Sequence, residues 1–159
     1  MADVHLRAMR SEEYDAWYRW AVEDYAATHT ASGEYAPQDA AGMAREAFAN
    51  LLPEGPGTAG HHLYTVTDAR NGEAVGVIWF AERRSTGVLQ AFIYDIVIWQ
   101  QHRGKGYGEA AMLAIEREVR ALGLHRIGLH VFGHNNTAIR LYERTGYRTT
   151  NLLMAKDVP

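Results

Sequence analysis

The residues best suited to chemistry form one short basic segment, Arg103-Gly104-Lys105-Gly106-Tyr107-Gly108. Glycines let a backbone approach a ligand closely, because no Cβ atom stands in the way. A helical pattern follows, and the free N–H groups at a helix start favour anions together with the helix dipole. The segment is therefore interpreted as an anion site, most naturally for phosphate. A basic glycine-rich turn without a ligand is the alternative.

The spacing of the glycines argues against the two common nucleotide-binding loops. A dinucleotide fingerprint needs G-x-G-x-x-G, but the third glycine comes one residue early and Glu109 stands in its place. A Walker A loop needs Gly-Lys followed by Ser or Thr, and the sequence has no such string.

Two motifs together resemble the GNAT-type N-acetyltransferases. Arg103-x-x-Gly106-x-Gly108 is similar to the R/Q-x-x-G-x-G/A motif of that family. The segment Asn135 to Tyr147, NNTAIRLYERTGY, resembles its N-x-x-A-x-x-L-Y-x-x-x-G-F signature, with Tyr147 where Phe is common. The motifs stand in the family's order, and the resemblance covers residues 88–147 well and the rest mainly by element order.

This resemblance implies a set of residues that bind acetyl-coenzyme A. The loop and the helix start would hold its pyrophosphate, and the backbone of the long apolar strand would bond the pantetheine amides. A backbone N–H near Ile96 would also polarise the thioester carbonyl. Asn135 would cap the second helix or contact the pantetheine. The implied binding residues are Ile96, Ile98, Arg103, Gly104, Lys105, Gly106, Tyr107, Gly108, Asn135 and Tyr142.

The resemblance also implies two catalytic side chains. Tyr142 matches the usual general acid, which protonates the departing thiolate. Asp95 is assigned as the general base, because it is the only acidic residue between Leu89 and Trp99. By strand alternation it is expected to face away from Tyr94, Ile96 and Ile98. Glu82 as the base, Tyr94 holding a water, and a purely structural role for Asp95 remain open.

The elements that must position these residues alternate between helical and strand patterns. Apolar spacings of three and four predict helices from Ser11 to about Tyr25, with Ser11 as N-cap, and from Pro37 to Leu52, with a loop over Thr28–Pro37 between them. A third helix follows the glycine-rich segment as far as Gly123, and a fourth spans Asn135–Thr145. Strands are predicted at Val4–Met9, His62–Thr67, Glu73–Ala81, Val88–Trp99, Leu124–Phe132 and Tyr147–Lys156.

This order predicts one mixed α/β layer structure, with residues 1–159 forming a single acyltransferase domain. The cofactor motif spans 96–122 and the second motif 124–147. The family resemblance implies a mostly antiparallel central sheet with helices on both faces. It also implies a splayed cofactor cleft between the strand that ends at Ile98 and the next strand.

Composition excludes several classes of site and suggests two kinds of ligand. The chain has no cysteine, which excludes cysteine-ligated metals and a cysteinyl acyl-enzyme; the eight histidines lack a helical ligand spacing, so no metal is expected. The net charge of −3 argues against nucleic acid. Residues 1–60 carry ten acidic and four basic side chains, and residues 61–159 carry nine and twelve. The acidic half would suit a cationic amine and the basic half an anionic cofactor.

The predicted function is therefore transfer of an acetyl group from acetyl-coenzyme A to a primary amine, by direct transfer in a ternary complex. The acceptor would be a cationic small molecule or a peptide amine. A catalytically silent coenzyme A-binding module and a different acyl group are the alternatives. No membrane helix or signal peptide is evident, so a cytoplasmic location is expected. Only ten residues, Tyr147–Lys156, follow Gly146 before the tail. The site is thus either open to a larger acceptor or completed by a second subunit in a homodimer.

Overall fold

The computed structural model describes the whole chain, residues 1–159, and is built on one five-stranded sheet. The strands are β1 (Val4–Ala8), β2 (His61–Asp68), β3 (Ala74–Ser85), β4 (Val88–Ile98) and β5 (Ile127–Leu129), adjacent in that order. The first four pair antiparallel, whereas β4 and β5 pair in parallel. A parallel pair needs a crossover connection, and a helix supplies it here.

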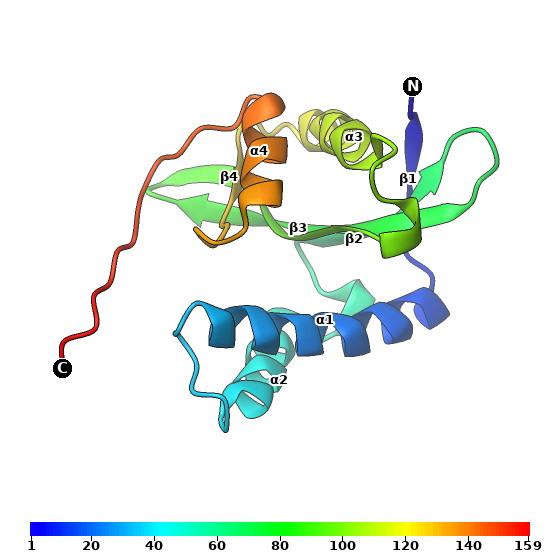
Figure 1. Cartoon of the computed structure of the whole chain (residues 1–159). Coiled ribbons are helices and arrows are strands. Elements are labelled where there is room, and N and C mark those ends of the chain that lie inside the picture. Colours follow the sequence, from blue (N-terminus) through cyan, green and yellow to red (C-terminus); the bar gives the residue numbers. More distant parts are fainter.

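Helices cover both faces of the sheet (Figure 1). On one face lie α1 (Ser11–Ala31) and α2 (Ala40–Leu51), and on the other lie α3 (Tyr107–Ala121) and α4 (Asn136–Arg144). The predicted architecture, a mixed α/β structure with a mostly antiparallel sheet and helices on both faces, is confirmed.

Side-chain alternation along the strands divides the core into two apolar clusters, one on each face of the sheet. Along β3, Ile78 packs with the α3 residues Met112 and Ile115. Its neighbour Trp79 packs with Trp17 of α1 and Phe48 of α2. This period of two is what a strand buried on both faces requires.

Two predicted helix boundaries are wrong by a few residues. α1 continues through Thr28–Ala31, where a loop was expected, because His29 stacks between Tyr25 and Tyr35 and this packing overrides weak helix propensity. α2 begins at Ala40 after a turn that includes Pro37, not at Pro37 itself. At the start of α1 the N-cap position is Arg10, so Ser11 is the first helical residue.

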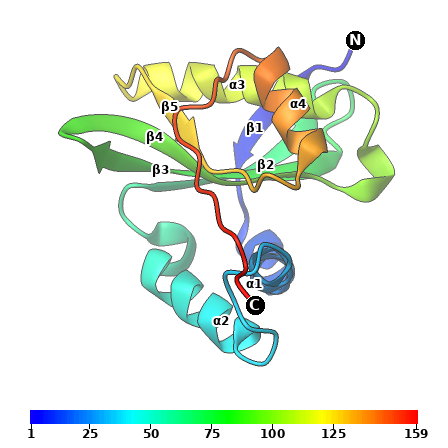
Figure 2. The same cartoon turned by 60° about the vertical axis from the view of Figure 1, so that its left-hand side comes forward.

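Two predicted strands near the C-terminus also differ. Of Leu124–Phe132, only β5 is paired, because the chain turns away from β4 after Leu129. The expected strand Tyr147–Lys156 does not form: the segment runs as an unpaired, extended tail that leads away from the body of the molecule in Figure 1 and passes in front of the sheet in Figure 2.

An irregularity in β4 changes the expected side-chain alternation. Trp79 pairs with Asp95, but the next residue, Phe80, pairs with Ile93, so Tyr94 is an extra residue in β4. At such a β-bulge two consecutive side chains can share one face. Asp95 faces away from Ile96 and Ile98, as expected, but it shares the α1 face with Tyr94, whose ring stacks on Trp79. The expected opposition of Asp95 and Tyr94 is therefore wrong.

Candidate active site

The sheet opens between β4 and β5. These strands pair only at Ala91–Ile93, so β4 runs on to Ile98 without a neighbour on that side. The Trp99 N–H donates to the Val75 carbonyl (2.9 Å), and bonded positions alternate along an antiparallel pair. The backbone groups of Ile96 and Ile98 therefore point away from β3 and into the opening. An extended ligand can bond to them there.

The end of this opening is bordered by the glycine-rich loop. Gly104 and Gly106 have positive φ angles of 75° and 87°, which turn the chain sharply into α3. The N–H groups of residues 104–109 donate to no protein acceptor. Unpaired N–H groups at the start of a helix form an anion site. The loop thus has the donors that a pyrophosphate group needs.

The side chains of the loop have more varied roles than the motif suggests. Arg103 donates from Nε to the Ile98 carbonyl (2.9 Å), which ties the loop to the end of β4. Lys105 is exposed and free to meet a phosphate. A Cβ atom on Gly108 would lie 3.2 Å from Leu141, so this glycine lets α4 pack against α3.

Tyr107 is buried and its side chain points away from the opening. Its hydroxyl donates to Asp68, at the end of β2, and Asp68 also accepts from the Arg70 guanidinium (2.8 Å). These bonds hold the pKa of the Asp68 carboxyl well below its usual range. Only the backbone of Tyr107 is available to a cofactor. The partnership with Asp68 was missed by sequence reasoning, because the two residues are 39 positions apart.

Tyr142 lies on α4, beside the opening. Burial raises its pKa to about 12, and the nearby Asp95 carboxylate contributes to the rise. The proton of this hydroxyl is therefore held at neutral pH. Asn135 caps α4, its side-chain oxygen accepting from the Ala138 N–H (3.2 Å), as the sequence suggested. That bond occupies the Asn135 oxygen and fixes the helix that carries Tyr142.

Asp95 lies on the α1 side of the same opening. Its carboxylate accepts a hydrogen bond from the Trp17 indole N–H (3.0 Å). Burial raises the pKa of Asp95 to about 7; the Trp17 bond opposes this shift and the charge of Asp24 adds to it. A carboxylate with this pKa can take a proton near neutral pH.

Asp24 is a candidate that sequence reasoning noted only as part of an acidic region. It lies on α1 seven residues after Trp17 and four after Trp20, so the three share one helix face. Trp20 packs edge-on against Trp99, with ring centroids 5.3 Å apart. Asp24 is exposed. Partial desolvation of its carboxyl group nevertheless raises its pKa, and the charge of Arg103 acts in the opposite direction. The helical spacing from Trp17 was the signal that could have singled it out.

Aromatic side chains gather where the α1–α2 connection meets the segment after β5. His29, near the end of α1, contacts Phe132 edge-on at 5.0 Å, which links this connection to the segment after β5. Tyr25 stacks on His29 at 3.8 Å. Aromatic faces next to carboxylates suit a cationic ligand.

Glu82, the alternative base, lies elsewhere. Its carboxylate pairs with His62 (3.1 Å), and its strand partner is Ala91, where β4 and β5 are still joined. Asp95 is thus the acidic residue of β4 at the opening, and Glu82 is not beside it.

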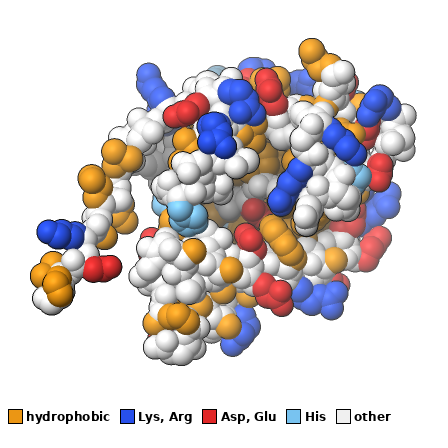
Figure 3. Space-filling view, viewed as in Figure 1, with side chains coloured by type: hydrophobic (Ala, Val, Ile, Leu, Met, Phe, Trp, Pro, Cys, Tyr) orange, Lys and Arg blue, Asp and Glu red, His pale blue; other side chains and the backbone are white.

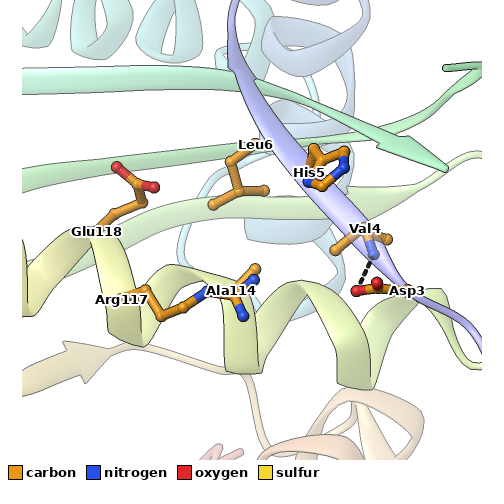
Figure 4. A pocket seen from close by; sticks show the side chains of 7 residues that line it. All are labelled: Asp3, Val4, His5, Leu6, Ala114, Arg117 and Glu118. Atoms are coloured by element: carbon orange, nitrogen blue, oxygen red, sulfur yellow. Dashed lines mark hydrogen bonds between the residues drawn. The ribbon is translucent and has the colours of Figure 1, made fainter. Parts of the chain in front are cut away.

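Figure 3 shows a hollow on this face, with Lys and Arg side chains around its upper part and acidic side chains at its floor and lower border. A hollow of about 430 Å³ lies beside the loop, lined by Trp20, Trp99, Gln100, Gln101 and Arg103. Another, of about 370 Å³, lies between β1 and α3 and includes Asp3, Arg117 and Glu118 (Figure 4). β1 is the opposite edge of the sheet from β5, so this second hollow is separate from the opening.

The sheet thus opens at its parallel edge, beside a helix start whose N–H groups are unpaired. The family model described as the acetyltransferase (GNAT) family matches residues 14–147. The chain belongs to this family.

Relatives over the full length support the assignment. The protein named uncharacterized N-acetyltransferase YycN of Bacillus subtilis strain 168 is 34% identical over 155 residues, covering 98% of this chain and 99% of its own length. The similarly named YdgE of the same organism is 32% identical, with 96% and 97% covered. The crystal structure of YycN superposes with a TM-score of 0.92 at 33% identity, covering 98% of this chain and 99% of its own. A Pyrococcus furiosus protein at 23% identity, with a TM-score of 0.71 and coverage of 99% and 100%, shares the fold.

The structure gives no sign of two other kinds of feature. None of the helices is both long enough and apolar enough to span a membrane. No group of three or more His, Cys, Asp or Glu side chains is arranged to hold a metal ion.

Proposed function

We propose that this protein transfers an acetyl group from acetyl-coenzyme A directly to the amine of a cationic acceptor. The observation that carries the proposal is the opening between β4 and β5, with Asp95 on one side, Tyr142 on the other and the free N–H groups of the loop at its end. Acetyl-coenzyme A supplies an activated acyl group as a thioester. Binding, orientation and proton transfer fall to the chain's own residues.

The cofactor would be held largely by backbone groups. The N–H groups of residues 104–109 would bind its pyrophosphate, with Lys105 adding positive charge. The outward N–H and C=O groups at Ile96 and Ile98 would bond the pantetheine arm. Arg103 already occupies the Ile98 carbonyl, so its guanidinium would move or share that acceptor.

Asp95 and Tyr142 would divide the proton transfers. The acceptor amine loses a proton to the Asp95 carboxylate as its nitrogen bonds to the acyl carbon. The carbon–sulfur bond breaks, and the Tyr142 hydroxyl donates its proton to the leaving thiolate. The two pKa values fit these roles, since Asp95 accepts protons near pH 7 and Tyr142 stays protonated there. The chain has no cysteine, which excludes a cysteinyl acyl-enzyme.

The acceptor would approach from the α1 side, where Asp24 and the aromatic side chains of Tyr25 and His29 lie. Carboxylates attract an ammonium group, and aromatic faces stabilise it by cation–π contact. We therefore propose a primary amine that carries a further positive charge, in a small molecule or a peptide.

Thiol release from acetyl-coenzyme A across a panel of amines tests the proposal, together with Tyr142→Phe. Loss of a general acid typically costs about 100-fold or more in turnover. Tyr147→Phe is the matched control, because its hydroxyl is buried without a partner and has no assigned role. Equal turnover in both variants would remove Tyr142 from the mechanism.

The same assay separates the two alternatives. If acetyl-coenzyme A raises the melting temperature but no amine stimulates thiol release, the chain is a binding module. Faster release from succinyl- or longer acyl-coenzyme A would assign a different acyl group.

A further inference from the structure

His61, the first residue of β2, is joined to the apolar cluster between the sheet and the helices α1 and α2 (Figure 1). Its Nδ1 atom accepts a hydrogen bond from the Trp79 indole N–H (3.0 Å). His61 pairs with Ala81, two residues after Trp79 on β3, so the two rings are diagonal neighbours on one face of the sheet. Trp79 is only 2% exposed, and a donor buried in this way needs such an acceptor.

The hydrogen bond requires one particular state of the His61 ring. Nδ1 accepts only when it carries no proton, so the ring must be neutral with its proton on Nε2. Burial lowers the pKa of His61, and the neighbouring His62 acts in the same direction. The ring is therefore a neutral acceptor near pH 7, where Asp95 titrates.

Trp79 contacts both of the features that place the Asp95 carboxylate. It is the strand partner of Asp95, and its ring stacks on Tyr94, the extra residue of the β-bulge, with ring centroids 4.8 Å apart. It also meets Trp17 edge-on, with centroids 5.5 Å apart. The Trp17 indole N–H in turn donates to Asp95 (3.0 Å). The His61 ring stacks on Tyr94 as well, at 5.9 Å.

These contacts form a continuous path from His61 to the carboxylate. His61 fixes the rotation of the Trp79 indole, and Trp79 packs against the ring that supplies the hydrogen bond to Asp95. Protein interiors are close-packed, so a change in the position of one ring displaces its neighbours. The Trp17 bond favours the charged form of Asp95 and limits the rise of its pKa. A weaker bond would therefore raise that pKa further.

We propose that His61 is a positioning residue for Asp95, acting through the Trp79 and Trp17 indoles to hold the hydrogen bond that the carboxylate accepts. The proposal rests on the function proposed above, in which Asp95 takes the proton of the acceptor amine. His61 itself takes no part in the proton transfer.

Other ionisable groups act on the two ends of this path. The charge of Asp24 on α1 acts on Asp95, which in turn acts on Tyr142 of α4, and His62 acts on His61. Asp24, Tyr142 and His62 are left unchanged in the variants that test the proposal.

Carbon-13 NMR of the aspartate carboxyl groups measures the titration of Asp95 directly, and its signal is assigned by the loss of that signal in Asp95→Asn. His61→Phe keeps an aromatic ring beside Tyr94 but removes the acceptor, so it is expected to move the Asp95 midpoint to higher pH. His61→Leu also lacks an acceptor and should shift the midpoint in the same direction, so the test does not depend on how a phenyl ring packs.

His61→Asn is the matched control, because its side-chain oxygen can take the place of Nδ1 as the acceptor. This variant should keep the native midpoint. An unchanged midpoint in His61→Phe and His61→Leu, or an equal shift in His61→Asn, overturns the proposal.

A double-mutant cycle shows whether His61 acts through Trp17. Trp17→Phe removes the donor and should raise the midpoint by roughly one pH unit or more, the effect of losing one hydrogen bond to a charged group. In that background His61→Phe should cause no further shift. Shifts that add in the double variant would show that His61 reaches Asp95 by another route, and would refute the proposal.

The same variants separate this inference from the proposed function. If both hold, the rise of kcat/KM with pH should move by as much as the NMR midpoint in each variant. A midpoint that moves while the rate profile stays in place would support the positioning role of His61 and remove Asp95 as the base. The NMR titration needs no turnover, so it decides the role of His61 even in a chain that transfers no acetyl group.

Discussion

Asp95 is the residue whose surroundings bear most directly on the chemistry. Burial raises the pKa of the Asp95 carboxyl group, and the hydrogen bond from the Trp17 indole N–H limits this rise. The β-bulge at Tyr94 turns both side chains toward α1. The resulting pKa of about 7 means that Asp95 is about half ionised near pH 7.

Asp95→Asn is expected to lower kcat/KM by about 100-fold or more, since a positioned base contributes about that much. In the native protein kcat/KM should rise with pH up to about 7 and then level off. The variant should lose this rise, and a pH–rate profile of both proteins measures the difference. A retained rise in the variant would assign the titration to another group.

The same substitution has an effect on stability whose sign follows from the raised pKa. The folded protein keeps the Asp95 proton up to about pH 7, whereas the unfolded chain releases it near the ordinary value of 3.8. This group therefore destabilises the fold increasingly as pH rises through that window. The side-chain amide introduced by Asp95→Asn cannot ionise, so the variant should gain more melting temperature over the native protein at pH 8 than at pH 4. Thermal melts of both proteins at pH 4 and pH 8 measure this difference, and a larger gain at pH 4 would contradict the prediction.

Asp24→Asn tests the residue of α1 whose charge adds to the raised pKa of Asp95. Removing its charge should lower the pKa of Asp95, so the rise of kcat/KM should move to lower pH. The KM for a dicationic amine should increase several-fold while the KM for acetyl-coenzyme A changes little. Glu23→Gln is the control, because Glu23 is the exposed neighbour on another side of the helix. Equal effects of the two substitutions would reduce Asp24 to general surface charge.

At the scale of elements, the start of α3 is held in place by a partner from across the sheet. Tyr107 directly follows Gly106, which has a left-handed backbone conformation. The Tyr107 hydroxyl donates a hydrogen bond to Asp68 at the end of β2, and Asp68 is only 2% exposed. The position of the free N–H groups at the start of α3 thus depends on β2, a strand that does not border the opening between β4 and β5.

Asp68→Asn is expected to raise the KM for acetyl-coenzyme A by roughly tenfold, the effect of losing one hydrogen bond to a charged group. kcat should change little, because Asp68 does not lie beside the reacting atoms. The depressed pKa of Asp68 means that its stabilisation is present above about pH 3.8 and is lost as pH falls below it. The melting temperature of the Asp68→Asn variant should therefore be lower than that of the native protein at pH 7, and the difference should shrink toward pH 3. Tyr107→Phe should reproduce the KM effect, and an unchanged KM in both variants would argue against a positioning role.

Most elements were predictable because their patterns are local. The long apolar run of β4, the alternation around Asn71-Gly72 and the spacing along α3 each identify one element. The bulge at Tyr94 was not predictable, because it exists only in the pairing of β4 with β3. The predicted strand Tyr147–Lys156 shows the same limit: its local pattern is typical of a strand, but no neighbouring strand pairs with it.

The site was predictable to a different degree. The glycine-rich loop and Tyr142 were identified from motifs, and their geometry fits the proposed roles. The tasks of Gly108 and Tyr107 could not be read from the loop, because they depend on Leu141 in α4 and Asp68 in β2. These contacts join positions far apart in the sequence, where no spacing rule applies.

On the scale of the whole molecule, the charge asymmetry of the sequence becomes an asymmetry between layers. The acidic residues 1–60 supply α1 and α2 on one face, and the basic remainder supplies α3 and α4 on the other. The opening between β4 and β5 lies where the two layers meet. A net charge of −3 conceals this arrangement, since the opposite charges largely cancel in the sum.

Ionic strength should therefore weaken the binding of both ligands, because each is attracted by the charges of one layer. Raising salt from about 0.05 to about 0.5 M shortens the screening length from roughly 14 to 4 Å, so attraction across the opening should weaken. The KM for a dicationic amine and the KM for acetyl-coenzyme A should both rise several-fold, with kcat nearly constant. An acceptor with one amine and one carboxylate serves as the control, because the acidic layer repels its carboxylate and salt should lower its KM or leave it unchanged. Steady-state kinetics at several salt concentrations measure all three. If cationic and carboxylate-bearing amines respond alike, the acidic layer does not select the acceptor, and only the assignment of the basic layer to the cofactor would stand.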